Sequence, residues 1–254
     1  MSNLFENKVV LVTGAGSGIG RAACIEFARE GAKVAVSDFR QDTGQETVDM
    51  IAASGGTAAF FNADMRSMSD IDAMVEATVA RFGGLNCAFN NAGHPGLGTD
   101  ALSCDEDEWE LVMTVNVKSV WRCMQRQIPH MLRAGGGAIV NTSSGLGLQA
   151  ATNSLAYVTS KHAVVGLSRS AALDYAPHNI RVNILHPGPT ETPMLTTATA
   201  ARGVQSQDLA PGVPMKRLGT AADLGHAAVY LCSDQADFIT GASLVVDGGV
   251  TIRR

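Results

Sequence analysis

Apolar, β-branched runs alternate with segments of helical periodicity along the whole chain. Short apolar runs are typical of buried strands, and longer amphipathic stretches are typical of surface helices. The predicted strands are Lys8–Thr13, Lys33–Asp38, Thr57–Asn62, Leu85–Asn90, Ala138–Thr142, Arg181–His186 and Leu244–Asp247. The predicted helices span residues 18–30, 41–54, 69–81, 105–132, 154–175 and 220–233. Because strands and helices alternate, we predict a doubly wound α/β fold whose parallel sheet is covered by helices on both faces.

Three local signals set the predicted ends of helices. Ser67 and Asp70 fit a capping box, in which serine and acid exchange hydrogen bonds with each other's backbone N–H. Gly31 stands where the first helix should stop, because glycine readily adopts the left-handed conformation of a helix end. Pro129 should end or kink the helix over 105–132 near its last turn.

The longest stretch without a clear period is Thr190–Gly219, which is rich in Thr, Ala, Gly and Pro. A loop of that length inside a compact domain is usually functional or disordered, and we predict a substrate lid at 190–219. No linker, repeat or composition shift divides the chain, so residues 1–254 are predicted to form a single domain.

Composition excludes several classes of protein. The chain has 46% hydrophobic and 17% charged residues and a formal net charge of −5, without the basic run of a nucleic-acid surface. No window approaches the length of apolar chain that crosses a membrane, and the first residues show no secretion signal, so we expect a cytoplasmic protein. Its five scattered cysteines form no Cys-x-x-Cys motif, which predicts reduced thiols and no metal site.

A glycine-rich turn follows the first predicted strand. Gly14, Gly18 and Gly20 give the spacing G-x-x-x-G-x-G, which differs from the common dinucleotide fingerprint G-x-G-x-x-G. Glycines let the backbone approach a ligand closely, and the helix that follows directs its free N–H groups at an anion. The turn therefore indicates either a nucleotide pyrophosphate site or an ordinary tight connection.

Asp38 ends the second predicted strand, 24 residues after Gly14. An acid at about this spacing hydrogen-bonds the adenosine ribose 2′-hydroxyl. At ~4 Å and an effective dielectric of ~20 a carboxylate repels each unit of phosphate charge by at most ~4 kcal/mol. Phe39 adds no positive charge, and Arg40 could soften the repulsion. We predict NAD as the cofactor.

Tyr157 and Lys161 stand four residues apart in a predicted helix, on the same face and one turn apart. Free tyrosine has a pKa of about 10. Lowering it by ~3 units takes ~4 kcal/mol, which one cation at ~4 Å supplies at an effective dielectric of ~20. The pair therefore predicts a general acid and base at neutral pH, although a surface tyrosine beside a lysine is the commoner origin of such a spacing.

Taken together, these features resemble the short-chain dehydrogenase/reductase family along the whole chain. The motifs that carry the resemblance stand in the family's order: Thr13-Gly-x3-Gly-Ile-Gly20, Asn90-Asn-Ala-Gly93, Asn116 in Val-Asn-Val, Ser144, Tyr157-x3-Lys161 and Pro187-Gly-x3-Thr192. The resemblance implies a Rossmann fold with a seven-stranded sheet, a nicotinamide cofactor and a homotetramer.

The resemblance also implies the catalytic roles. Tyr157 would exchange a proton with the substrate oxygen, and Lys161 would lower its pKa and bind the nicotinamide ribose. Ser144 would donate to the substrate oxygen, with the adjacent Ser143 as the competing assignment. Asn116 would hold a water that links Lys161 to solvent. Ser144 is preferred because it stands 13 residues before Tyr157, the spacing of the family.

The implied cofactor residues come from several loops. Asp64 and the Met65 backbone resemble the adenine site, and Thr190 replaces the Ile or Val often found at its position. That contact is therefore expected to rest on backbone atoms. The full set implied for the cofactor is Gly14, Ser17, Gly18, Ile19, Gly20, Asp38, Asp64, Met65, Asn91, Ala92, Gly93, Tyr157, Lys161, Pro187, Gly188, Thr190 and Thr192.

The sequence leaves the substrate open. His94, Ser144, Leu146 and Asn153 are the candidate substrate contacts, beside mostly small or apolar neighbours, while His186 matches no catalytic position of the family. The leading hypothesis is an NAD(H)-dependent oxidoreductase that interconverts a secondary alcohol and a ketone. The alternatives are an NADPH-dependent 3-oxoacyl-thioester reductase and, with less support, a cofactor-sensing protein without catalysis.

Overall fold

One parallel sheet of seven strands forms the centre of the molecule, in the order β3-β2-β1-β4-β5-β6-β7. A computed structural model describes residues 3–200 and 203–253. The strands are β1 (Val9–Thr13), β2 (Lys33–Asp38), β3 (Thr57–Asn62), β4 (Cys87–Asn90), β5 (Gly137–Thr142), β6 (Ile180–Pro187) and β7 (Ser243–Val246). Each begins and ends within two residues of its predicted bounds. The predicted doubly wound Rossmann architecture is confirmed.

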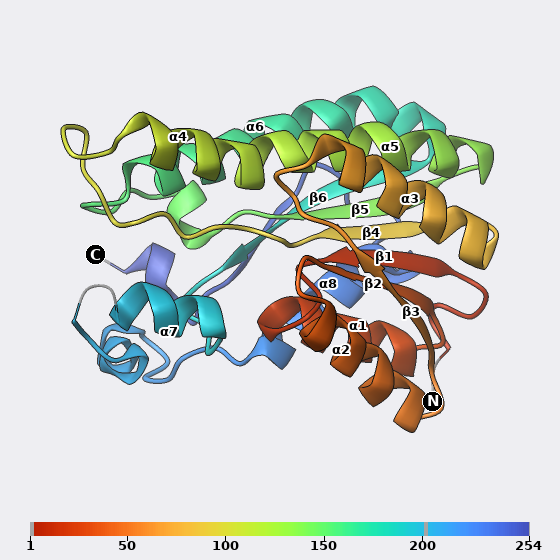
Figure 1. The fold of residues 1–254 in the computed structure, drawn as a ribbon, viewed down its shortest axis with the longest axis horizontal. Helices are drawn as coiled ribbons and strands as arrows, with labels where there is room; N and C mark the ends of the chain where they lie inside the picture. The colour runs from red at the N-terminus through yellow and green to blue at the C-terminus, as the bar shows by residue number, and fades with distance from the viewer. Residues whose placement is uncertain (1–2, 201–202, 254) are drawn as a thin grey trace.

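Helices cover both faces of this sheet (Figure 1). The α-helices are α1 (Gly18–Arg29), α2 (Gln41–Ala53), α3 (Met68–Phe82), α4 (Glu106–Met113), α5 (Ser119–Arg133), α6 (Leu155–Tyr175), α7 (Pro193–Ala200) and α8 (Ala221–Cys232). Helices α1, α2 and α8 pack on one face, and α3, α5 and α6 pack on the other. The strand order reverses direction between β1 and β4, which is where open α/β sheets bind ligands.

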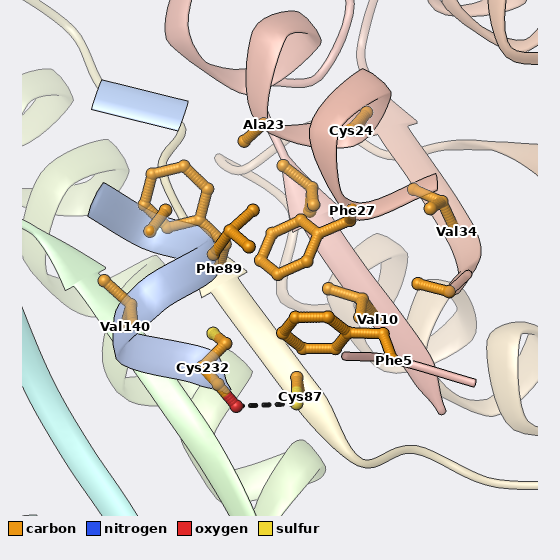
Figure 2. Packing of buried hydrophobic residues seen from close by; sticks show 14 of the residues in the cluster. Phe5, Val10, Ala23, Cys24, Phe27, Val34, Cys87, Phe89, Val140 and Cys232 are labelled. Atoms are coloured by element: carbon orange, nitrogen blue, oxygen red, sulfur yellow. Dashed lines mark hydrogen bonds between the residues drawn. The ribbon is translucent and has the colours of Figure 1, made fainter. Parts of the chain in front are cut away.

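The core below β1 and β4 is built from aromatic and aliphatic side chains (Figure 2). Phe5 and Phe27 pack edge to face, with ring centroids 5.1 Å apart and an interplanar angle of 85°. Phe89 and Val10 are fully buried beside them. Dense packing on both faces of the sheet holds the carboxyl ends of the strands in a fixed arrangement, so the loops there start from a rigid base.

Two of the three predicted helix ends differ from expectation in detail. Ser67 accepts a hydrogen bond from the Asp70 N–H, but the Asp70 carboxylate accepts from the Asp64 N–H and only half of the capping box forms. Helix α5 continues past Pro129 to Arg133, because a proline in the last turn removes only one backbone bond. Gly31 has the left-handed φ of +91° expected just after α1.

Candidate active site

The four predicted catalytic residues come from three neighbouring segments. Ser144 follows the carboxyl end of β5, and Tyr157 and Lys161 lie in the first two turns of α6. Asn116 lies in a π-helical turn, Thr114–Lys118, which interrupts the helix predicted over 105–132. Such turns are rare and are found mostly at functional sites.

The structure distinguishes the two adjacent serines. The Ser143 side chain donates to the main-chain oxygen of Lys161 at 2.8 Å and is buried, so its hydroxyl supports the backbone. The Ser144 hydroxyl oxygen accepts from the Leu146 N–H at 3.1 Å, a bond that does not use its own proton. The same hydroxyl lies close enough to the Tyr157 phenol to lower its pKa. Ser144 is therefore the serine that stands with Tyr157.

The expected low pKa of Tyr157 is not found in the protein chain alone. Burial raises the pKa of the phenol above its ordinary value, and the nearby Ser144 hydroxyl only partly opposes that rise. The Lys161 ammonium lies 5.5 Å from the centroid of the tyrosine ring and donates to the Thr142 carbonyl at 3.0 Å. Attraction between the Tyr157 phenolate and the Lys161 ammonium lowers the pKa of the phenol, but the cost of burying both charged groups opposes it. Spacing in the sequence gives no measure of that cost.

Asn116 holds the segment after β4 against Lys161. Its amide oxygen accepts from the His94 N–H at 2.7 Å, while its amide nitrogen donates to the His94 carbonyl and to the Ser160 hydroxyl. A Cβ added to Gly93 would lie 3.3 Å from the Asn116 oxygen and 3.4 Å from the Lys161 ammonium. Both amide protons of Asn116 are used, so any water at this residue must bind its oxygen atoms.

The glycine turn packs closely against two other loops. Gly14 and Gly18 have φ values of +63° and +52°, and a Cβ on Gly20 would lie 2.1 Å from the Gly14 carbonyl oxygen. The backbone of Ala92 and the methyl group of Thr192 lie against Gly14 and Gly18 respectively. The carboxyl ends of β1 and β4 and the segment after β6 thus converge at the amino end of α1, where a helix binds anions.

Asp38 is fixed against this turn. One carboxylate oxygen accepts from the Gly16 N–H at 2.9 Å, and the other accepts from the Arg40 N–H at 3.0 Å. The side chain is only 6% exposed. The Arg40 guanidinium lies over the Phe39 ring, 5.8 Å from its centroid, and leaves the carboxylate without a cationic side-chain partner from that residue.

Comparison with known proteins decides the family. Residues 14–251 match the family described as enoyl-(acyl carrier protein) reductase. The chain is 42% identical over 251 residues to a cyclohexanol dehydrogenase of Acinetobacter sp., covering 99% of this chain and 98% of that protein. It is 43% identical over 252 residues to a 2,5-dichloro-2,5-cyclohexadiene-1,4-diol dehydrogenase of Sphingobium indicum, covering 99% of each.

A solved structure gives the same result. The 3-ketoacyl-(acyl-carrier-protein) reductase of Brucella melitensis, complexed with NADH, superimposes with a TM-score of 0.90 at 35% identity, covering 97% of this chain and 99% of that one. The chain belongs to the short-chain dehydrogenase/reductase family. As a member of this family it is a nicotinamide-dependent oxidoreductase that acts on CH–OH groups.

The residues present fit the nicotinamide cofactor of a short-chain dehydrogenase/reductase. No side chain beyond hydrogen fits at Gly14 or Gly20, because a Cβ there would lie 2.9 Å from the Ala92 Cα and 2.1 Å from the Gly14 carbonyl oxygen respectively. These glycines keep the turn compact at the amino end of α1, where a pyrophosphate would bind. The Thr190 hydroxyl donates its proton to the Gly188 carbonyl at 2.9 Å, and a cofactor contact through the Thr190 backbone stays a prediction. Asp64 lies beyond β3, where Arg66 pairs with its carboxylate and lowers its pKa.

The predicted substrate contacts lie on two loops of this short-chain dehydrogenase/reductase. The His94 ring accepts from the Gly96 N–H through Nδ1 at 3.2 Å, and burial lowers its pKa, so the neutral ring carries its proton on Nε2. Leu146 lies in a short 3₁₀ turn beside Ser144, and Asn153 takes a left-handed φ of +51° before α6.

The predicted lid contains regular structure that its sequence did not indicate. Pro193 opens α7, Thr192 caps it by accepting from the Leu195 N–H, and a 3₁₀ segment follows at Ser206–Gly212. The expectation of an irregular loop is therefore wrong for these parts, since Thr and Ala in place of large apolar residues hide the helical period. Residues 201 and 202 of this segment lie outside the described residues.

Glu108 near the site was missed from the sequence, and His186 was considered there without a contact to Ser144 being predicted. The buried Glu108 carboxylate accepts from the Leu97 N–H and the Thr99 hydroxyl, both at 2.6 Å, and so supports the loop that begins at His94. It stands in the acidic run 105–108, which has the pattern of a solvated helix start. His186 contacts the Ser144 carbonyl, and no spacing rule points to it.

Among the described residues, no group of three or more His, Cys, Asp or Glu side chains is arranged to hold a metal ion. In the same part of the chain, no helix has the length and apolar character needed to cross a membrane.

Burial of Lys161 makes a testable contribution to stability. The side chain is 3% exposed, and its burial lowers the pKa to about 8 from the ordinary 10.5. The folded state therefore binds the proton less well than the unfolded chain, and burial destabilises the protein below pH 8. This cost of ~3 kcal/mol fades as the pH rises toward 10.5, where both states lose the proton.

We expect Lys161→Met to be more stable than the wild type by about 2 kcal/mol at pH 7, after ~1 kcal/mol for the lost hydrogen bond to Thr142. Urea denaturation at pH 7 and pH 10 measures the effect, and the advantage should shrink at the higher pH. Lys33→Met, at an exposed lysine, is the control and should change little. A Lys161→Met protein that is no more stable than wild type at pH 7 contradicts the argument.

Proposed function

We propose that this protein is an NAD(H)-dependent oxidoreductase that interconverts a secondary alcohol and a ketone. The observation that carries the proposal is the contact of Ser144 with the Tyr157 phenol, with Lys161 against the same ring. A phenol and a hydroxyl placed together match the two hydrogen bonds that a carbonyl or alcohol oxygen can make. The nicotinamide, when bound, supplies or accepts the hydride.

Each side chain has a distinct part in the proposed reaction. Ser144 donates to the substrate oxygen and orients it, and Tyr157 gives its proton to that oxygen in the reducing direction or takes it in the oxidising direction. The raised pKa keeps the phenol protonated near neutral pH, which prepares it as the acid for ketone reduction. Lys161 provides positive charge beside the ring and a donor for the nicotinamide ribose, while Asn116 braces the segment beside it.

Asp38 favours NAD over NADP. Its carboxylate is held in place by the Gly16 and Arg40 N–H groups and so cannot swing away from a ligand at this strand end. A ribose 2′-hydroxyl can donate to such a carboxylate, whereas a 2′-phosphate is repelled by it. The related 3-ketoacyl reductase of known structure was solved with NADH.

We further propose a cyclic secondary alcohol or the matching ketone as the substrate. Two relatives with 42% and 43% identity are dehydrogenases of cyclohexanol and of a chlorinated cyclohexadiene diol. The segment that follows Ser144 is apolar at Leu146 and Leu148 and carries the small side chains of Ala150 and Ala151. Nothing at these positions carries the charge that a phosphate or carboxylate substrate needs.

A 3-oxoacyl-thioester reductase is the second candidate, supported by the related 3-ketoacyl-(acyl-carrier-protein) reductase of Brucella melitensis. Asp38 argues against its NADPH-dependent form, as set out above. A cofactor-sensing protein without catalysis is the least supported reading, because Ser144, Tyr157, Lys161 and Asn116 are all present and together.

A substrate panel tests these candidates. Purified protein is mixed with NAD⁺ and secondary alcohols, cyclohexanol among them, or with NADH and ketones, including a 3-oxoacyl thioester, and the reduced nicotinamide absorbance is followed. We expect turnover of the cyclic compounds with kcat/KM at least about tenfold above the thioester, the gain from ~1.4 kcal/mol of better fit. Preference for the thioester selects the second candidate, and cofactor binding without turnover on the whole panel selects the third.

We also propose a homotetramer of single-domain cytoplasmic subunits, with the segment over 190–219 as the lid. Phe238 and Ile252, near the C-terminal end, are 101% and 85% exposed, as expected of side chains that a neighbouring subunit covers. Light scattering on the purified protein measures the mass of the assembly.

A further inference from the structure

His186 is a buried histidine at the end of β6, beside the candidate site. Its side chain is 0% exposed, and Nδ1 lies 2.8 Å from the Ser144 carbonyl oxygen. Among the described residues its other ring nitrogen, Nε2, is buried without a hydrogen-bond partner. An orphaned buried nitrogen costs free energy, so the position of this ring needs an explanation.

The tautomer of His186 follows from its one hydrogen bond. A carbonyl oxygen only accepts, so Nδ1 carries the proton and Nε2 has the lone pair. Burial is the main cause that lowers the pKa of the ring, the bond to Ser144 opposes it, and Arg169, Lys161 and His162 of α6 lower it further. His186 is therefore neutral and remains a fixed donor to Ser144.

This bond adds a side-chain contact between two segments that the backbone already joins one residue away. The Ser143 N–H donates to the Leu185 carbonyl at 2.8 Å, as part of the pairing of β5 with β6. His186 connects the Ser144 carbonyl itself to the end of β6. The next two residues, Pro187 and Gly188, are the nicotinamide segment, which the family resemblance implies to contact the cofactor. The His186 hydrogen bond therefore helps to fix the substrate serine relative to this segment.

We propose that His186 is a positioning residue that holds Ser144 at a fixed distance from the nicotinamide segment through its Nδ1–H. The inference rests on the proposed function, because Ser144 acts there on the substrate oxygen. A displacement of about 1 Å between reacting groups can cost ~100-fold in rate, so loss of the tie should lower kcat more than it weakens cofactor binding.

Three substitutions separate the hydrogen bond from packing. His186→Asn keeps an N–H donor close to the place of Nδ1, His186→Gln moves the donor toward the place of Nε2, and His186→Leu removes it. We expect kcat of the Leu and Gln variants to fall about 10- to 100-fold, and the Asn variant to stay within about threefold of wild type. The Kd for NAD⁺, measured by fluorescence titration, should change less than about threefold in all three.

The kcat values of the three His186 variants, compared with one another and with wild type, test the positioning role. Equal kcat in wild type and His186→Leu overturns it, and so does an equal loss in all three variants, which indicates packing alone. Should the Leu variant fail to fold by thermal melting, the comparison of Asn with Gln still decides, because both are polar amides in the same buried place. A common rise in the Kd for NAD⁺ would instead assign His186 to cofactor binding and overturn the positioning role.

A second measurement separates this inference from the proposed function. Nitrogen-15 NMR of the His186 ring reports the tautomer without any substrate, and we expect a neutral ring with the proton on Nδ1. The Ser144 amide signal should shift in the Leu variant and return toward wild type in the Asn variant. If the wild type turns over no compound of the substrate panel, the proposed function fails. The spectra still test whether His186 donates a hydrogen bond to the Ser144 carbonyl. A neutral ring that carries its proton on Nε2 cannot donate from Nδ1 to the Ser144 carbonyl, so this result overturns the positioning role whatever the activity.

Discussion

Replacing Tyr157 by Phe is expected to lower kcat/KM by about 10²- to 10⁴-fold, the usual contribution of a positioned general acid and base. The change removes one hydroxyl and keeps the ring, which stays in contact with the Lys161 ammonium 5.5 Å from its centroid. The loss should therefore come from the missing proton transfer and leave the fold intact. Steady-state rates with the best substrate of the panel, in both directions, measure it.

Tyr175→Phe is the matched control for this prediction. Tyr175 lies at the other end of α6 and loses the same hydroxyl, at a distance from Ser144 and Lys161. Its kcat/KM should stay within about twofold of wild type, as for most changes away from a site. A Tyr157→Phe protein that binds NAD⁺ and turns over at the wild-type rate would remove Tyr157 from the mechanism, and Ser144 would then be the remaining proton carrier.

The sequence predicted the sheet well because each strand carries a strong local signal. The strands β1, β2, β4 and β5 are almost entirely buried, so their apolar runs are unbroken and their bounds can be predicted to within two residues. Helix α7 was missed for the opposite reason. Its short sequence from Pro193 to Ala200 is rich in Thr and Ala and carries no clear apolar stripe.

The structure brings the predicted catalytic residues together, and their roles stay predictions: Ser144, Tyr157, Lys161 and Asn116. The electrostatics of these residues could not be predicted from the sequence. Sequence spacing shows that two groups are close and gives no measure of how far each is buried. Burial raises the pKa of Tyr157 and lowers that of Lys161 to about 8, the reverse of what attraction alone predicts for the tyrosine.

The residues that support the site were the hardest to predict. Glu108 and His186 act through backbone groups of distant segments, namely the Leu97 N–H and the Ser144 carbonyl. Such contacts depend on how the loops fold over the sheet, and neither residue type nor spacing encodes them. A buried polar side chain that bonds a loop backbone is visible only once the loop path is known.

Removing the charge of Asp38 is expected to shift cofactor preference toward NADP. In Asp38→Asn the side chain keeps its size and loses the carboxylate that faces the glycine turn. The 2′-phosphate of NADP carries about −1.5 to −2 charges, as phosphate monoesters do near neutral pH. We expect kcat/KM for NADPH to rise about 10²- to 10³-fold, which corresponds to ~3–4 kcal/mol of lost repulsion. The ratio of kcat/KM for NADPH to that for NADH should rise about 10³- to 10⁴-fold, because NADH use falls as well.

The rise in the NADPH-to-NADH ratio of kcat/KM should come from changes with both cofactors. NADPH improves because the repulsion disappears, and NADH worsens by about tenfold because a charged hydrogen bond to the ribose is replaced by a neutral one. Salt gives an independent check, since higher ionic strength screens charge and should raise NADPH use by wild type more than by Asp38→Asn. Initial rates with each cofactor at low and high salt provide the numbers.

Arg40→Ala is the matched control, because it changes the charge next to Asp38 with the opposite sign. Arg40 is exposed and stacks on Phe39, and only its backbone N–H contacts the Asp38 carboxylate. The bond to Asp38 should therefore survive the change, with NADH kinetics within about twofold of wild type and NADPH use falling as a nearby cation is lost. An unchanged NADPH-to-NADH ratio in Asp38→Asn would show that cofactor choice is made elsewhere, and preference for NADPH by wild type would overturn the NAD assignment.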